Sequence, residues 1–331
     1  MPSGDGARTI GPIIPPQPAP MPTPTTRPPL NIGLALRMTR PGFLLITAVG
    51  VVLGLASASA CGCGFSSARA AAALLLALLA HAAANVLNDA EDARNGADAA
   101  NTAGLYPFTG GARLIQNGLV TAEDTRRLAL ALLAVVVPGG LLLAVYSGGG
   151  LVLIGLAGLA LGWAYSAPPL ALMSRGLGEL AVAAAWWLVV VGADYSQRGQ
   201  FLWVPAASAL SYAVLVANVL LINGVPDAPA DARVGKRTLA VRLGARGAAV
   251  LYLLIALAAH AWLALGVWRQ VQPVAAAWGL VSLPVSLAAA VLFVRQARTP
   301  QALRAAIVLT IAAATLHGLA MAAGFVAMAH S

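Results

Sequence analysis

Residues 85–98 read Asn85-Val86-Leu87-Asn88-Asp89-Ala90-Glu91-Asp92-Ala93-Arg94-Asn95-Gly96-Ala97-Asp98, and they follow an apolar run that begins near residue 68. A run of this length is about what an α-helix needs to cross a bilayer, roughly 20 residues. A carboxylate beside hydrocarbon is costly unless a cation neutralises it. The stretch therefore predicts a membrane helix that ends in a cation-binding site.

The composition extends this prediction to the whole chain. Apolar residues make up 60% of the sequence and charged residues 9%, which excludes an ordinary soluble domain. Apolar segments of spanning length lie at 43–60, 68–88, 127–147, 150–167, 178–193, 201–223, 247–268, 273–294 and 304–328. We expect an all-α polytopic membrane protein in which residues 31–331 form nine transmembrane helices around a central cavity. The segments are too long, and too poor in β-branched and aromatic residues, for a membrane β-barrel.

The first 30 residues differ from the rest, because they hold ten of the 21 prolines and show almost no apolar periodicity. They are expected to be a disordered tail rather than a signal peptide, whose apolar segment the prolines would break. A short interfacial helix is expected to follow at 34–40, leading to Arg40-Pro41 and the first span.

The basic residues set the expected orientation. With nine spans, seventeen of the 20 Lys and Arg residues fall on one side, and only Arg69, Arg198 and Arg269 fall on the other. The positive-inside rule then places the N-terminus and the acidic stretches on the cytoplasmic side of the membrane. We expect that membrane to be the inner (plasma) membrane of a bacterium. The net charge of +9 is explained mostly by this topology, so no nucleic-acid partner is expected.

A second acidic stretch follows the sixth span and reads Asn223-Gly224-Val225-Pro226-Asp227-Ala228-Pro229-Ala230-Asp231, with Arg233, Lys236 and Arg237 just beyond it. The two stretches together hold six of the eleven acidic residues. Asn88 and Asn223 each close a span, four spans apart, which suggests two related four-helix units plus one further helix. Their acidic ends are expected to meet over the central cavity.

The spacing of the acids suits a hard divalent cation, which takes oxygen ligands and shares them with a phosphate. On a helix, Asn85, Asn88, Asp89 and Asp92 are expected to share one face. Asn95-Gly96 breaks that helix, so Asp98 is expected in a loop. Asp227 and Asp231, four residues apart, point the same way if the helix continues through Pro226 and Pro229.

Several other positions have two interpretations each. Arg40 is a positive-inside anchor or a phosphate contact, and Tyr165, before Pro168-Pro169, is an interfacial anchor or a site residue. Gly110-Gly111, in the hydrophilic stretch 99–124, is able to bring backbone amides close to an anion. Cys61 and Cys63 are expected to be small apolar residues without a disulfide, and the four histidines to be packed residues without a role in chemistry.

These motifs resemble the UbiA superfamily of intramembrane aromatic prenyltransferases. Asn88-Asp89-x-x-Asp92, with Asp98 displaced by two residues, matches the first motif of that family. The pattern that begins Asp227-x-x-x-Asp231 and runs through Gly235-Lys236-Arg237 to Gly244 matches the second. Both are similar to the MenA-like branch, which prenylates dihydroxynaphthoate, as is Tyr165-Ser-Ala-Pro-Pro. The Arg-Pro that follows the first motif in the hydroxybenzoate and haem O branches is missing, and the loop at 107–113 differs from the best-known MenA sequences.

The resemblance implies a reaction. A polyprenyl group is transferred from polyprenyl diphosphate to an aromatic quinone precursor, such as 1,4-dihydroxy-2-naphthoate, and diphosphate is released. It implies two Mg²⁺ ions on Asp89, Asp92, Asp98, Asp227 and Asp231. Tyr165 would face the allylic cation, and the isoprenoid tail would lie among apolar helices open to lipid. The residues implied for substrate binding are Asn85, Asn88, Arg40, Arg94, Arg113, Lys236 and Arg237.

Two other classes of membrane protein share some of these features. An ion-coupled transporter also carries intramembrane carboxylates and helical repeats, but its acids usually lie in the middle of a span, whereas these lie at span ends. A phospholipid-headgroup transferase also uses an Asp-rich Mg²⁺ site. It concentrates its acids in one motif, so the second stretch at Asp227 and Asp231 argues against it.

Overall fold

The computed structural model describes residues 30–62 and 64–330, and these ranges contain helices and no strand. The long helices are α2 (Pro41–Ser59), α3 (Ser67–Asn95), α5 (Ala122–Ser147), α6 (Gly150–Ser166), α7 (Gly178–Arg198), α8 (Trp203–Arg233), α9 (Leu239–Trp268), α10 (Leu283–Gln296) and α11 (Arg304–Ala329). Shorter elements are α1 (Ile32–Met38), α4 (Ala97–Ala100) and the 3₁₀ helices η1 (Leu172–Arg175), η2 (Val274–Ser282) and η3 (Pro300–Leu303). The all-α prediction is confirmed, while the prediction of a disordered tail lies almost wholly outside the described residues.

Within the described ranges, eight helical stretches are long and apolar enough to cross a bilayer, counting η2 with α10 and η3 with α11. The apolar helix α6, with 17 residues, is the ninth and shortest. Each corresponds to one of the nine segments expected from the sequence. The helix α8 is the most enclosed, with 78% of its most apolar window buried, against 22% for α3 and for α5.

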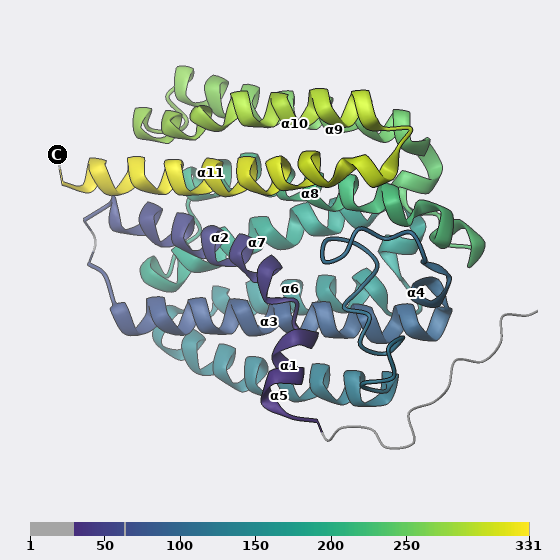
Figure 1. The fold of residues 1–331 in the computed structure, drawn as a ribbon. Helices are drawn as coiled ribbons and strands as arrows, with labels where there is room; N and C mark the ends of the chain where they lie inside the picture. Colours follow the sequence, from purple (N-terminus) through teal and green to yellow (C-terminus); the bar gives the residue numbers. More distant parts are fainter. Residues whose placement is uncertain (1–29, 63, 331) are drawn as a thin grey trace, which may run out of the picture.

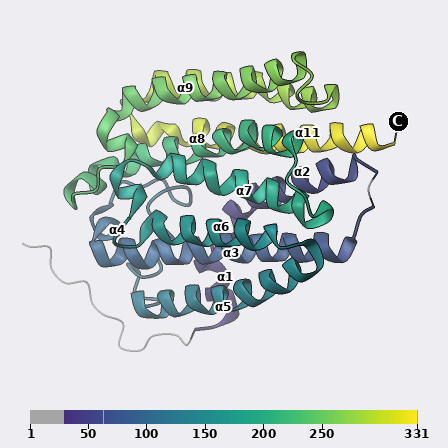
Figure 2. The same ribbon diagram turned by 180° about the vertical axis from the view of Figure 1, so that it is seen from behind.

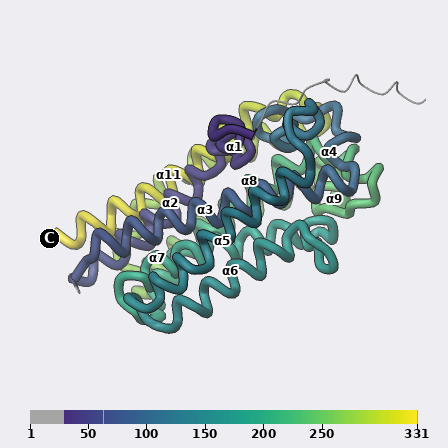
Figure 3. Tube along the Cα trace, turned by 90° about the horizontal axis from the view of Figure 1, so that it is seen from below, coloured from purple at the N-terminus to yellow at the C-terminus, as the bar shows by residue number. Residues whose placement is uncertain are grey.

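The long helices run alongside one another as a tilted bundle (Figures 1 and 3). In Figure 1, α9 and α10 lie at one edge, α5 lies at the other, and α8 and α11 lie between them. The view from behind shows α7 and α6 on the opposite side of the bundle (Figure 2). The acidic ends of α3 and α8 and the short α4 gather at one end, while the C-terminus lies at the other. The arrangement places the motif residues together at one end.

Small residues bring some helices into close contact, as is common where lipid supplies no hydrophobic driving force. A Cβ on Gly54 of α2 would lie 2.2 Å from the Val190 carbonyl oxygen of α7. A Cβ on Gly324 of α11 would lie 2.1 Å from the Ala275 carbonyl oxygen of η2. At these two glycines the helix backbones touch, and any larger residue would force them apart.

The acidic helix ends follow local sequence signals. The helix α3 ends at Gly96, whose φ of +83° suits glycine in a helix cap. Asp98 then falls in the single turn of α4 rather than in the loop that was expected. The helix α8 continues through Pro226 and Pro229 to Arg233, so Asp227 and Asp231 do lie one turn apart on the same side.

Of two expectations about the cysteines and histidines, one was wrong and one is confirmed for the residues described next. Cys61 is disulfide-bonded, so the expectation of a free, small apolar residue at that position was wrong. It overlooked Gly62, whose positive φ of +66° tightens the turn. His260 and His317 are packed as expected: both bond to the Ser282 hydroxyl, at 2.9 and 3.0 Å.

Candidate active site

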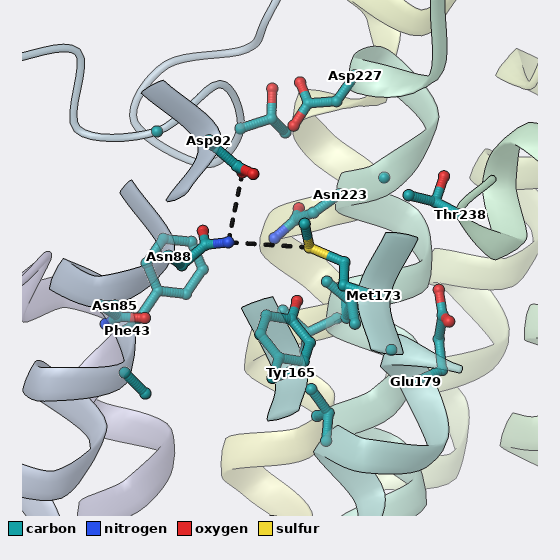
Figure 4. A pocket seen from close by; sticks show the side chains of 18 of the residues that line it. Phe43, Asn85, Asn88, Asp92, Tyr165, Met173, Glu179, Asn223, Asp227 and Thr238 are labelled. Atoms are coloured by element: carbon teal, nitrogen blue, oxygen red, sulfur yellow. Dashed lines mark hydrogen bonds between the residues drawn. The ribbon is translucent and has the colours of Figure 1, made fainter. Parts of the chain in front are cut away.

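The end of α3 presents three polar residues to a cavity. Asn85, Asn88 and Asp92 line it, as their spacing predicts. Asn88 Nδ2 donates to Asp92 Oδ2 (3.3 Å) and to the Ser166 hydroxyl of α6 (3.1 Å). Figure 4 shows Asn88 between Asp92 and Met173. The first acidic motif is thus held against the end of α6.

Asp89 faces a different direction from its neighbours. It forms an ion pair with Arg40 and accepts a hydrogen bond from the Ala112 amide (3.1 Å), and it is absent from the cavity lining. The expectation that all four polar residues share one face was wrong for Asp89. Asp89 lies at the edge of that face, about 100° around the helix from Asn88 at 3.6 residues per turn, and there Arg40 and the Ala112 amide bind its carboxylate.

The end of α8 supplies the opposite wall. Asn223, Asp227 and Asp231, at intervals of four residues, all line the same cavity as Asp92. Asn223 Oδ1 is buried without a hydrogen-bond partner. A buried acceptor in that state normally carries a free-energy cost, so this oxygen is available to a ligand.

Lys236 joins the two motifs. Its side chain is only 5% exposed, and its Nζ lies 2.5 Å from Asp92 Oδ1 and 3.4 Å from Asp231 Oδ1. The backbone N–H of Lys236 also donates to the Asp231 carbonyl oxygen (2.9 Å), which fixes the chain just after α8. One buried ammonium group therefore touches carboxylates from both helix ends.

The hydrophilic stretch after α4 covers this end of the cavity, and we call residues 101–113 the roof loop. Asn101 Nδ2 and the Gly110 amide donate to Asp227, at 2.6 and 3.1 Å. Gly110 and Gly111 have φ values of +79° and +73°, which glycine adopts freely. The expectation that this glycine pair brings an amide to an anion is confirmed, and the anion in the structure is the Asp227 carboxylate.

The cavity has a volume of about 240 Å³ and is strongly acidic. Five carboxylates line it, those of Asp92, Asp98, Glu179, Asp227 and Asp231, against two cationic side chains, those of Arg40 and Lys236. Tyr165, Met173 and Glu179 form its lower part in Figure 4, below Asp92 and Asp227. The excess of negative charge favours a bound cation.

Electrostatic shifts agree with this picture. Burial raises the pKa of Asp98 to about 7, and the nearby carboxylates of Asp92 and Asp89 add to the effect. Burial acts to lower the pKa of Lys236, but Asp92 and Asp231 outweigh it, so that this pKa is raised. The pKa of Arg40 is likewise raised, because Asp89 and Asp98 overcome the effect of burial. Both cations therefore stay charged beside their carboxylates.

Three residues predicted to bind substrate lie away from the cavity. Arg94 pairs with Glu91 and is 57% exposed. Arg113 donates to the Asn101 carbonyl oxygen (2.7 Å) within the roof loop. Arg237 is exposed, and its amide donates to the Ser174 carbonyl oxygen (2.8 Å). None of the three lines the cavity, so their roles in substrate binding stay predictions.

The sequence predicted no role in the site for several other lining residues. Asn101 donates a hydrogen bond to Asp227, and Asn223 lines the cavity one turn before Asp227. The cavity is lined deeper in the bundle by Glu179, His81 and Trp186. A signal existed for Asn223, which stands four residues before Asp227 as Asn88 stands four before Asp92. His81 and Trp186 carried no spacing signal, because only the packing of α3 against α7 brings them together.

The donor set suits Mg²⁺, which binds carboxylate and amide oxygens and keeps several positions for water or phosphate. Within residues 30–62 and 64–330, no three His, Cys, Asp or Glu side chains gather closely enough to hold an ion by themselves. Oxygen atoms of a bound anion would have to complete the coordination. The free Asn223 Oδ1 and the lining carboxylates fit that shared arrangement.

A second cavity, of about 700 Å³, adjoins the first between α3, α5, α6 and α7. Its lining is almost entirely apolar. The two cavities share five lining residues: His81, Ala84, Gly162, Ala185 and Trp186. The structure therefore places an acidic site directly beside a space suited to hydrocarbon.

Comparison with known proteins agrees with these features. Residues 43–312 match the model of the UbiA prenyltransferase family. A 1,4-dihydroxy-2-naphthoate octaprenyltransferase of Mycobacterium tuberculosis is 35% identical over 211 residues, which cover 62% of this chain and 68% of the relative. The enzyme of that name from Bacillus subtilis is 27% identical, over 68% of this chain and 71% of the relative.

Solved structures share the fold. A UbiA homolog from Archaeoglobus fulgidus bound to GPP and Mg²⁺ superposes with a TM-score of 0.58 at 16% identity, covering 90% of this chain and 99% of the other. A UbiA homolog from Aeropyrum pernix K1 gives a TM-score of 0.61 at 18% identity, covering 83% and 96%.

Proposed function

Because the chain belongs to the UbiA prenyltransferase family, we propose that it transfers a polyprenyl group from polyprenyl diphosphate to 1,4-dihydroxy-2-naphthoate, with release of diphosphate. The observation that carries the proposal is the convergence of Asp92 and Asp231 on Lys236 in one acidic cavity beside an apolar one. The names of the similar proteins from Mycobacterium tuberculosis and Bacillus subtilis support the naphthoate acceptor.

The polar cavity binds the diphosphate end of the donor. Lys236 and Arg40, both on its wall, would donate to the non-bridging oxygens and stabilise the charge that develops on the leaving group. We assign the ligands of Mg²⁺ to Asp92, Asp98, Asp227 and Asp231. Bound there, Mg²⁺ would neutralise charge on the diphosphate. Asp89 would act on the site indirectly, by holding Arg40 and the Ala112 amide.

The carbon–oxygen bond of the donor then breaks, and its electron pair leaves with the diphosphate. Tyr165, in the last turn of α6, lines the wall below the carboxylates, where its ring faces the allylic cation. The donor chain lies in the apolar cavity, which excludes water from the cation. An electron-rich ring carbon attacks the cation and forms the new carbon–carbon bond. The same ring carbon then loses the group it carried, a hydrogen as a proton or the carboxylate as carbon dioxide, and the ring becomes aromatic again.

The alternative of an ion-coupled transporter requires acids along a path through the membrane. Four of the five lining acids instead lie at or just beyond the ends of α3 and α8, which meet at one end of the bundle: Asp92, Asp98, Asp227 and Asp231. Family membership also favours an enzyme. We place the site on the cytoplasmic side of a bacterial inner membrane, as the distribution of basic residues favours.

The test uses membranes that contain the full chain, a fixed polyprenyl diphosphate, and either dihydroxynaphthoate or hydroxybenzoate. We expect release of diphosphate and formation of a prenylated naphthalene product only with Mg²⁺ and dihydroxynaphthoate. Asp92→Asn is the matched inactive variant. Turnover with hydroxybenzoate alone would move the acceptor assignment to another branch, and turnover that persists in EDTA would reject the metal site.

A further inference from the structure

The side of the apolar cavity that α6 forms contains three glycines. Gly155, Gly158 and Gly162 all line it, and their spacing of three and four residues puts them on one face of the helix. A Cβ placed on any of the three would have no atom within 4 Å. We call these three residues the glycine track. Each leaves room that an ordinary side chain would fill.

Glycine in membrane helices usually allows close helix packing, and this chain contains examples of that use. A Cβ on Gly54 would lie 2.2 Å from the Val190 carbonyl oxygen, and one on Gly324 would lie 2.1 Å from that of Ala275. The glycine track has no such neighbour. These glycines therefore leave open space beside the helix, and close helix packing does not explain them.

The track starts at the polar cavity and leads away from it. Gly162 lines both cavities, and Tyr165, one turn later, lines only the polar one of the two. Gly158 and Gly155 follow at about 6 Å and then about 4.5 Å further along the helix, at a rise of 1.5 Å per residue. One helix turn is similar in length to one extended isoprene unit, so successive glycines match successive positions along a prenyl chain.

On α3 and α5, small residues line the cavity between larger ones such as Leu76 and Leu133. Ala77, Ala80 and Ala84 of α3 line the cavity, together with Gly140 of α5. At the junction of the two cavities the His81 and Trp186 rings meet edge to face, with centroids 4.9 Å apart. The passage from the polar site to the apolar cavity therefore lies beside this ring pair and Gly162.

We propose that the glycine track carries the isoprenoid chain of the donor away from the diphosphate site and determines the longest chain that the enzyme accepts. This inference rests on the proposed prenyl transfer. The track is continuous with the acidic cavity through Gly162, and the donor is the substrate that has an anionic head and a hydrocarbon tail. A bulky residue at a track position should therefore exclude donors whose chain extends past that position. Each of the three positions should set its own limit on chain length.

The experiment compares geranyl, farnesyl and geranylgeranyl diphosphate as donors for wild-type protein and for Gly162→Leu, Gly158→Leu and Gly155→Leu. Leucine favours helix over glycine, so α6 should form in each variant. Gly149→Leu is the matched control, because its Cβ also meets nothing within 4 Å but it lies outside both cavities. Alanine at the same track positions gives a smaller change in case a leucine variant fails to fold.

We expect Gly158→Leu to keep geranyl transfer and to lose about tenfold or more in kcat/KM with geranylgeranyl diphosphate, because overfilling an apolar pocket discriminates by chain size. Gly162→Leu should affect all three donors, Gly155→Leu only the longest, and Gly149→Leu none. Equal effects on all donors at Gly158 and Gly155, or no effect, would overturn the inference and leave a lipid acyl chain as the occupant. Absence of wild-type turnover with any donor would instead overturn the proposed function, and the inference with it.

Discussion

Lys236 Nζ lies 2.5 Å from Asp92 Oδ1, although 144 residues separate them in the sequence. The same nitrogen lies 3.4 Å from Asp231 Oδ1. A single ammonium group thus links the ends of α3 and α8, which form two walls of the acidic cavity. Its removal would leave the carboxylates of Asp92 and Asp231 without the cation that joins them.

Lys236→Met should therefore lower kcat/KM by about 10²–10³-fold, the usual effect of removing one preorganised electrostatic donor. Arg246→Met is the control, because that side chain is exposed, lies outside the cavity and has no predicted role in substrate binding. Steady-state kinetics with varied donor concentration measure both variants. Equal losses in the two would contradict the role given to Lys236.

Asp89 and Asp92 should behave differently when each is changed to asparagine. Asp92→Asn removes a carboxylate from the cavity wall and should abolish turnover while the melting temperature in detergent stays near that of wild type. Asp89→Asn leaves Arg40 partly buried without its partner, which should destabilise the fold by about 3 kcal/mol. Thermal unfolding and activity are measured in parallel, and a stable but inactive Asp89→Asn protein would instead favour direct metal ligation by Asp89.

The stability of the metal-free protein should fall as the pH rises from about 4 to about 7. Burial raises the pKa of Asp98 to about 7, whereas an aspartate in an unfolded chain titrates near 3.9. Between these values the folded state binds the proton more tightly, so raising the pH removes stability. Melting temperatures in EDTA at several pH values test this, and Asp98→Asn should show a flatter profile over the same range.

Gly111→Ala should impair activity more than an alanine at another glycine with a positive φ, because its Cβ would also crowd Asp98. Alanine costs about 1–2 kcal/mol in the left-handed region, and a Cβ there would lie 2.7 Å from Asp98 Oδ2. Gly62→Ala is the control, since Gly62 also has a positive φ but an open Cβ position. Similar activity in the two variants would show that the contact with Asp98 is unimportant.

Much of the fold was predictable because apolar run length and the distribution of Lys and Arg report directly on membrane spans. The shared face of Asp227 and Asp231 followed from a spacing of four residues, since α8 continues through its prolines. The separate orientation of Asp89 was not predictable, because it depends on the ion pair with Arg40 from another helix. Spacing within one helix carries no information about such a partner.

The apolar cavity illustrates a second limit of the sequence. Gly155, Gly158 and Gly162 are indistinguishable by sequence from glycines that pack helices together, such as Gly54. Only the position of neighbouring atoms separates the two uses. Likewise, Arg94 lies within the first acidic stretch and Arg237 lies shortly after the second, yet neither lines the cavity.

The hydrogen bonds that Asp227 accepts from Asn101 and Gly110 make the roof loop a competitor for the carboxylate that the cation needs. Thermodynamic linkage is reciprocal. If cation binding weakens the hydrogen bonds between Asp227 and the loop, then a change that weakens those bonds increases the affinity for the cation by the same factor. Binding of the cation and release of the roof loop from Asp227 are therefore coupled.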